Sequence, residues 1–240
     1  MTGSKLVDYQ KVAKVYVQGR ALPADVLARW GAAVQPHLPK GPLRVADVGA
    51  GTGIFAAAWP GWGAASVVAV EVSEAMAREG RAVAPYALGQ AEALPLAASS
   101  VDVVWMSTAF HHFADQAAAA AEIDRVLRPD GVVLIRTFLP DRLSYFDRFP
   151  GIERALERVP GLDVFAARFE PHGFAVRHVE HVPDIQTTHG EAADWVERMR
   201  HADSLLTALT DDEVAEGVRR LRAAPDERAA LEISLVVLGR

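Results

Sequence analysis

Cysteine is absent from the 240 residues of the chain. Its absence excludes disulfide bonds, thiolate metal sites and thiol nucleophiles together. A chain without thiols fits a reducing compartment, so we expect a cytoplasmic protein.

The sequence also lacks a surplus of basic residues and a long hydrophobic run. It carries 31 acidic and 25 basic side chains, a formal net charge of −6, so nucleic acid is not an expected partner. The most apolar stretches, such as residues 131–135 and 234–238, are too short to span a bilayer. The amino terminus has no apolar segment followed by a cleavage site, so we expect neither a signal peptide nor a membrane partner.

A third absence concerns the glycine-rich stretch VADVGAGTG, residues 45–53. A dinucleotide-binding loop needs Gly-x-Gly-x-x-Gly, but the third position counted from Gly49 is Ile54. No Gly-Lys-Ser/Thr follows, which excludes a P-loop. Asp47 would repel a phosphate at this point. A ligand with an amine or hydroxyl groups fits the loop better than a pyrophosphate.

Short apolar segments alternate with helical patterns over the first two thirds of the chain. The pattern predicts strands at 43–48, 66–72, 84–88, 101–106 and 132–138, with a turn at 128–131. It predicts helices at 24–37, from about 53, at 73–81 and at 115–127. This alternation is typical of a parallel sheet covered on both faces.

The last third is mainly helical and interrupted by prolines. Strands are expected at 174–182 and 231–238, and helices over 141–169 and 191–222, with a break and a capping box at Thr210 and Glu213. We therefore expect a single domain over 1–240. Its parts are a helical cover (1–40), a ligand-binding core (41–138) and an acceptor-side half (139–240), in which a helical cap spans about 141–170 and 187–225.

Five motifs in order resemble the class I S-adenosylmethionine (SAM)-dependent methyltransferases, in particular the small-molecule branch with a type 11 methyltransferase domain that includes quinone-biosynthesis C-methylases. The motifs are the glycine loop, VVAVEVSEAM (67–76), GQAEALPL (89–96), VDVV (101–104) with FHHF (110–113), and EIDRVLRPDG (122–131). The resemblance implies a Rossmann-like α/β fold with a seven-stranded, mostly parallel sheet, helices on both faces and a helical cap.

The resemblance also implies SAM as cofactor and S-adenosylhomocysteine as product. The residues that it assigns to the cofactor are Asp47, Gly49, Ala50, Gly51, Gly53, Glu71, Val72, Gln90, Ala91, Ser107, Tyr16 and Arg20. Glu71 stands at a strand end about twenty residues after the loop, where a carboxylate can accept both ribose hydroxyls. Gln90 departs from the aspartate usual in the family, and a neutral amide should contribute less to binding an adenine amine.

Methyl transfer needs alignment more than a protein nucleophile, and a base only if the acceptor is protonated. His111 and His112 are the best base candidates, although both can equally be packing residues. We expect at most one of them to face the acceptor, because adjacent side chains point in different directions. They lack a third ligand at metal-site spacing, so no metal is expected.

Four apolar side chains of the last third can line an acceptor pocket or form the core of the cap: Phe146, Phe149, Trp195 and Met199. The leading hypothesis is methylation of an O, N or C atom of a small molecule. The alternatives are a relative that binds SAM but catalyses another reaction, and a silent SAM-binding partner protein. The chain can be a monomer or a homodimer.

Overall fold

A seven-stranded mixed sheet forms the centre of the protein. The computed structural model describes residues 22–141, 144–157, 159–203 and 205–240. The strands are β1 (Leu43–Val48), β2 (Ala64–Glu71), β3 (Tyr86–Leu88), β4 (Val101–Ser107), β5 (Leu127–Thr137), β6 (Ala175–Thr188) and β7 (Arg228–Gly239). Their order is β3-β2-β1-β4-β5-β7-β6, and β7 alone runs in the opposite direction to the other six strands. The predicted seven-stranded, mostly parallel sheet is confirmed.

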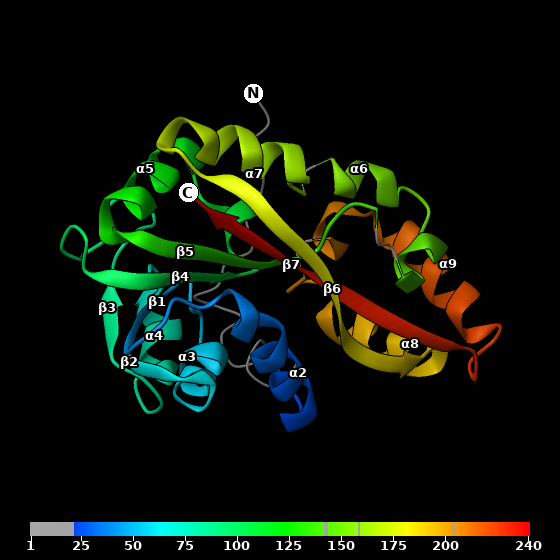
Figure 1. The fold of residues 1–240 in the computed structure, drawn as a ribbon. Coiled ribbons are helices and arrows are strands. Elements are labelled where there is room, and N and C mark those ends of the chain that lie inside the picture. The colour runs from blue at the N-terminus through cyan, green and yellow to red at the C-terminus, as the bar shows by residue number, and fades with distance from the viewer. Residues whose placement is uncertain (1–21, 142–143, 158, 204) are drawn as a thin grey trace.

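Helices cover both faces of this sheet (Figure 1). The α-helices are α2 (Ala24–Val34), α3 (Ile54–Ala58), α4 (Glu74–Gly80), α5 (Gln116–Val126), α6 (Ile152–Leu156), α7 (Leu162–Phe169), α8 (His189–Met199) and α9 (Asp211–Arg222). The short 3-10 helices are η1 (Gln35–His37), η2 (Trp59–Trp62), η3 (Phe110–His112), η4 (Ser144–Arg148), η5 (Glu170–His172) and η6 (Leu206–Ala208). Helices α5 and α7 share one buried apolar cluster with the sheet, and α2, α3 and η2 share the cluster on the opposite face.

Local sequence signals fix several helix starts. Asp115 accepts hydrogen bonds from the backbone N–H groups of Ala117 and Ala118 and so begins α5. The predicted capping box at Thr210 and Glu213 begins α9. These side chains satisfy donors that the first helical turn leaves without backbone partners.

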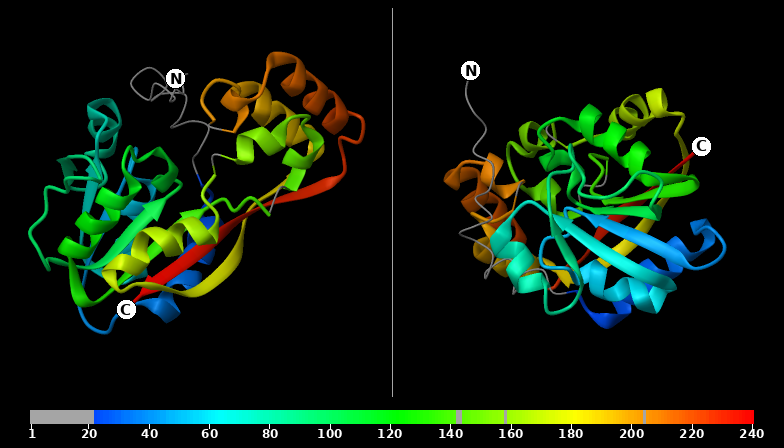
Figure 2. Two further views of the ribbon diagram at one scale, coloured as in Figure 1. Left: turned by 90° about the horizontal axis from the view of Figure 1, so that it is seen from above. Right: turned by 90° about the vertical axis from the view of Figure 1, so that its left-hand side faces the viewer.

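The cap has its own apolar core and is joined to the sheet by two long strands. Helices α6, α8 and α9 pack with η4 and η6 in one cluster that includes Phe149, Val196 and Leu221. Figure 2 shows β6 and β7 running together from the sheet into this helical region. The two strands pair along their whole length, from Ala175 with Gly239 to Thr188 with Arg228.

The largest differences from the predicted strands and turns are in two segments. Residues 128–131 were predicted as a turn, but β5 begins at Leu127 and these residues form an irregularity between the pairs Val101–Leu127 and Val103–Val132. Strand β6 was predicted to end at Val182 and instead reaches Thr188. None of the helices in the described ranges combines the length and the apolar character needed to cross a bilayer.

Candidate active site

The carboxyl ends of the central strands border two adjoining cavities. One of them, called the main pocket here, lies between the glycine loop, the ends of β4 and β5, and the cap. The other, called the side hollow, lies against the ends of β2 and β3. Gly49 and His112 line both cavities, so one extended ligand can occupy the two together.

The glycine loop turns sharply at the end of β1. Gly49 and Ala50 both donate to the Val70 carbonyl of β2, at 2.8 and 3.2 Å. Gly49 has a φ of +72°, and a Cβ built on it would lie 2.5 Å from the Cβ of Ala109. Only glycine fits there without strain. Gly51, by contrast, faces open space, where backbone can approach a ligand directly.

Glu71 ends β2 and holds the loop from the other side. Its two carboxylate oxygens accept hydrogen bonds from the backbone N–H groups of Gly51 and Ser73, each at 2.8 Å. Each oxygen retains a lone pair, and the residue lines the side hollow. A buried carboxylate that is already oriented in this way can accept further bonds from ligand hydroxyls.

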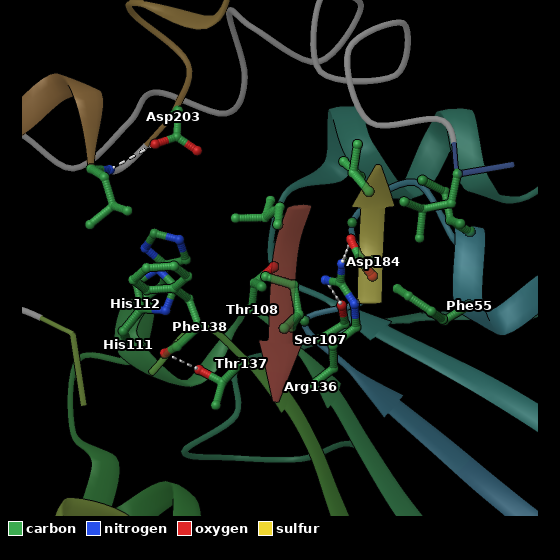
Figure 3. A pocket seen from close by; sticks show the side chains of 18 of the residues that line it. Phe55, Ser107, Thr108, His111, His112, Arg136, Thr137, Phe138, Asp184 and Asp203 are labelled. Carbon is green, nitrogen blue, oxygen red and sulfur yellow. Dashed lines mark hydrogen bonds and ion pairs between the residues drawn. The ribbon is translucent and has the colours of Figure 1, made fainter. Parts of the chain in front are cut away.

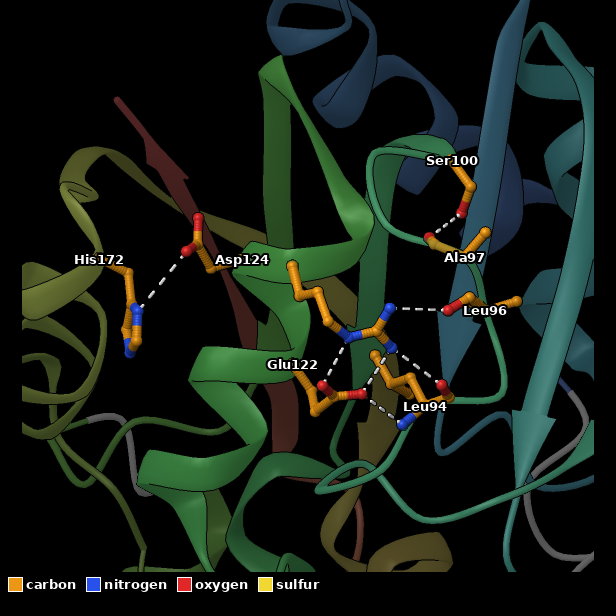
Figure 4. A network of polar contacts seen from close by, with 8 residues as sticks. Leu94, Leu96, Ala97, Ser100, Glu122, Asp124 and His172 are labelled. Atoms are coloured by element: carbon orange, nitrogen blue, oxygen red, sulfur yellow. Dashed lines mark hydrogen bonds and ion pairs between the residues drawn. The ribbon is translucent and has the colours of Figure 1, made fainter.

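Gln90, Ala91 and Val72 also line the side hollow. The loop that follows Gln90 is fastened to α5, because Glu122 accepts from the Leu94 N–H at 2.8 Å (Figure 4). Arg125 donates to the carbonyls of both Leu94 and Leu96. This network gives Glu122 and Arg125, which belong to the motif EIDRVLRPDG, a physical role: they hold the loop that follows Gln90 against α5.

Asp47 is buried in the middle of the sheet and lines the main pocket. Neither of its carboxylate oxygens has a hydrogen-bond partner of normal geometry among the described residues. Burial raises its pKa to about 8, assisted by the nearby Glu71 carboxylate and opposed by the Ala56 backbone N–H. An unpartnered buried carboxyl requires a ligand donor or its own proton.

His111 and His112 follow β4 on the 3-10 helix η3. Both line the main pocket, and their rings lie 3.9 Å apart between centroids. The sequence predicted that at most one of them faces the acceptor; in the structure both side chains border the same cavity. The tight η3 turn folds the backbone so that consecutive side chains converge instead of diverging (Figure 3).

A buried ion pair forms the pocket wall opposite the histidines (Figure 3). Arg136 of β5 pairs with Asp184 of β6 and donates to the Ser107 hydroxyl at 3.2 Å. Asp184 also accepts from the Trp30 indole N–H at 2.6 Å. The guanidinium of Arg136 lies 5.1 Å from the Trp30 ring and 5.3 Å from that of Phe55.

Sequence reasoning identified Ser107 but missed Arg136, Asp184 and Trp30. The sequence offered one signal for this wall, the acid Asp184 beside Pro183, but its partners Trp30 and Arg136 lie on other elements. These contacts fix the wall as a rigid, internally neutralised surface.

The cap supplies the apolar part of the pocket. Phe138, Phe146, Trp195 and Leu205 line it together with the buried carboxyl of Asp203. Phe149 and Met199 instead belong to the buried core of the cap. Of the four side chains considered from the sequence, Phe146 and Trp195 both line the pocket and pack in the cap core, whereas Phe149 and Met199 belong to the core alone. Tyr16 and Arg20 lie outside the described residues.

Comparison with known proteins places this arrangement among the methyltransferases. A family model described as "Methyltransferase domain" matches residues 46–135. The chain is 40% identical to malonyl-[acyl-carrier protein] O-methyltransferase of Methylococcus capsulatus over 112 residues, which cover 42% of this chain and 40% of that protein. It is 31% identical to the protein of the same name from Pectobacterium atrosepticum over 171 residues, covering 66% and 67%.

The fold is similar to that of a solved putative methyltransferase from an antibiotic biosynthesis pathway of Anabaena variabilis. The TM-score is 0.69 at 24% identity, and the match covers 93% of this chain and 99% of that one. The match to the Methylococcus protein spans two fifths of that protein's length, and the match to the Pectobacterium protein two thirds.

Proposed function

The chain belongs to the class I S-adenosylmethionine-dependent methyltransferases, and from this premise we propose that it transfers the methyl group of SAM to a small molecule held between the sheet and the cap. The observation that carries the proposal is the unpartnered carboxyl of Asp47 beside a glycine loop that Glu71 holds in place. When bound, SAM supplies a methyl group on a positively charged sulfur.

The residues present fit this cofactor. We assign Asp47 to the ammonium group of the methionine part, because a buried carboxyl without a partner is stabilised by a cationic donor. We assign Glu71 to the ribose hydroxyls and the Ala91 backbone N–H to the adenine ring, since both residues line the side hollow. Gln90 borders the same hollow and presents an amide oxygen to the adenine amine.

The chain contributes to methyl transfer mainly by alignment and exclusion of water. The rigid wall of Arg136 and Asp184 and the apolar side chains of the cap enclose the space beyond the glycine loop. Both restrict the acceptor to one approach, which lowers the entropic cost of reaching the in-line geometry. Phe138, Phe146 and Trp195 favour an acceptor with an apolar body.

His111 and His112 are the proposed proton acceptors for a hydroxyl or amine acceptor. The named activity of the curated relatives suggests a second acceptor class, a malonyl group carried on an acyl carrier protein. A carboxylate is already deprotonated near pH 7, so its methylation needs no general base. The two acceptor classes therefore make opposite predictions for the histidines.

The first experiment measures S-adenosylhomocysteine affinity by calorimetry. Replacing Glu71 by Ala should weaken binding at least tenfold, because a charged hydrogen bond contributes about 1.5–3 kcal/mol. Glu74→Ala is the matched control, since Glu74 is an exposed glutamate on the adjacent helix. Equal affinities of the two variants would refute the assignment of Glu71.

The second experiment follows transfer of an isotopically labelled methyl group. Hydroxyl and amine compounds with an apolar body are compared with malonyl thioesters as acceptors. Loss of rate at neutral pH in both His111→Ala and His112→Ala, with recovery at high pH, supports a protonated acceptor. Unchanged rates with a malonyl thioester support the carboxylate class. Cofactor binding without label transfer to any acceptor would support the non-methylating or silent alternatives.

A further inference from the structure

Three metal-ligating side chains meet on the edge of the sheet, outside the site already described. They are His37 at the end of η1, and His178 and Glu180 on β6. One donor atom from each lies within 4.8 Å of the other two. The His37 and His178 rings are 4.7 Å apart between centroids, and His178 Nε2 lies 3.8 Å from a Glu180 carboxylate oxygen. We propose that these residues bind a divalent transition-metal ion.

The packing of helix α2 against strand β6 produces this convergence. His178, Glu180 and Val182 alternate along β6 and lie on one face of the sheet. Val182 is buried in the same cluster as Trp30 of α2, and Arg29 of that helix donates to the Pro183 carbonyl at 2.9 Å. The segment that continues α2 then reaches the earlier part of β6, where His37 meets the two ligands of the strand.

The donor set selects the class of ion. Two imidazoles and one carboxylate suit zinc and its first-row neighbours, whereas Mg²⁺ and Ca²⁺ prefer oxygen ligands alone. The side chains of His178 and Glu180 remain 44% and 46% exposed, so water can complete the coordination. A site with three protein ligands and open positions is an ordinary arrangement for zinc.

The proposed site lies apart from the main pocket. Asp184 in the pocket wall lies six positions after His178 on β6, a span of roughly 20 Å in an extended strand. A bound ion would therefore not touch the reacting atoms. It would link the end of η1 to an edge strand, and so stabilise the helix that covers this face of the sheet. This inference does not depend on the identity of the methyl acceptor.

The test is calorimetric titration of the metal-free, untagged full chain with Zn²⁺. We expect one ion per chain and, at a hundredfold excess over Kd, a rise in Tm of roughly 5 °C or more. His37→Ala, His178→Ala and Glu180→Gln should each weaken binding at least tenfold. His201→Ala is the matched control, because His201 is an exposed histidine of the cap and is not part of the cluster.

The Tm of each variant in EDTA shows whether it folds as the parent does. Glu180→Gln keeps the shape of an exposed side chain, so it tests the site even if a histidine variant is unstable. Cobalt(II) provides a spectroscopic readout, since its visible absorption on binding should disappear in His178→Ala. Absence of stoichiometric binding, or equal weakening in His201→Ala and the cluster variants, would overturn the proposal.

Discussion

Replacing Asp47 by asparagine should make the protein without cofactor more stable at neutral and alkaline pH. The pKa of Asp47 is raised from 3.8 to about 8, so the folded protein keeps this carboxyl protonated while the unfolded chain releases the proton. The stability associated with the neutral carboxyl is fully present below about pH 4. It is lost progressively as the pH rises to about 8.

The size of the effect follows from the difference between the two pKa values. A difference of about four units corresponds to about 6 kcal/mol at 1.36 kcal/mol per unit. Asp47 lines a pocket that water can enter, so we expect about half of that, about 3 kcal/mol, to be recovered by asparagine at pH 8. For a chain of this length, the corresponding increase in Tm is roughly 6–12 °C.

The assay is urea denaturation of the parent and Asp47→Asn at intervals from pH 4 to pH 9. Above pH 4 the parent should lose up to about 1.4 kcal/mol per pH unit relative to the variant, and the difference should reach about 3 kcal/mol by pH 8. Near-ultraviolet circular dichroism verifies that both proteins share one fold. Stability curves that remain parallel over the whole range would refute the account of Asp47 as a destabilising, unpartnered acid.

Three further predictions concern the same region. Binding of S-adenosylhomocysteine at pH 7 should release up to one proton from Asp47, measured by calorimetry in buffers of different ionisation enthalpy; the Asn variant should release none. Asp184→Ala should lower the free energy of unfolding, measured by urea denaturation, by about 3–5 kcal/mol, because it leaves Arg136 buried without its partner. Replacing both residues by apolar ones should restore much of the lost stability. Gly53→Ala should lower the free energy of unfolding by about 1–3 kcal/mol, because φ is +82° at this residue. Gly61→Ala is the control and should lower it less, since a Cβ there would face open space. A similar loss of stability in both variants would contradict the strain argument.

The central strands could be predicted well because their signals are local. Strand β1 was predicted with the bounds it has, 43–48, because an apolar run is closed by Gly49 on one side and by Pro42 on the other. Glu71 was placed at the end of β2 by its spacing from the glycine loop. Its hydrogen bond to Gly51 was not predictable, because it depends on how β1 and β2 align.

Strand β6 shows why the later part was harder to predict. Pro183 lacks a backbone donor, so the sequence indicated a strand end beside it. At the edge of the sheet β6 pairs with β7 alone, and a proline there loses little. The pairing continues past an irregularity between Pro183 and Ile185, and Asp184 at that point turns toward Trp30 and Arg136.

The convergence of the pocket histidines and of the His37 cluster was also beyond sequence reasoning. The first depends on the turn geometry of η3, which two adjacent histidines do not reveal. The second depends on the order of strands, which brings β6 to the edge that α2 and η1 cover. Both are consequences of tertiary packing.

Strands β6 and β7 continue without interruption from the core sheet into the cap. The cap over the acceptor pocket and the sheet that carries the cofactor site therefore share these two strands. In evolution or in protein engineering, this cap cannot be exchanged as a separate module without replacing two strands of the sheet. A change of acceptor is therefore most accessible through single side chains on the inner surface of the cap, such as Phe146, Trp195 and Leu205.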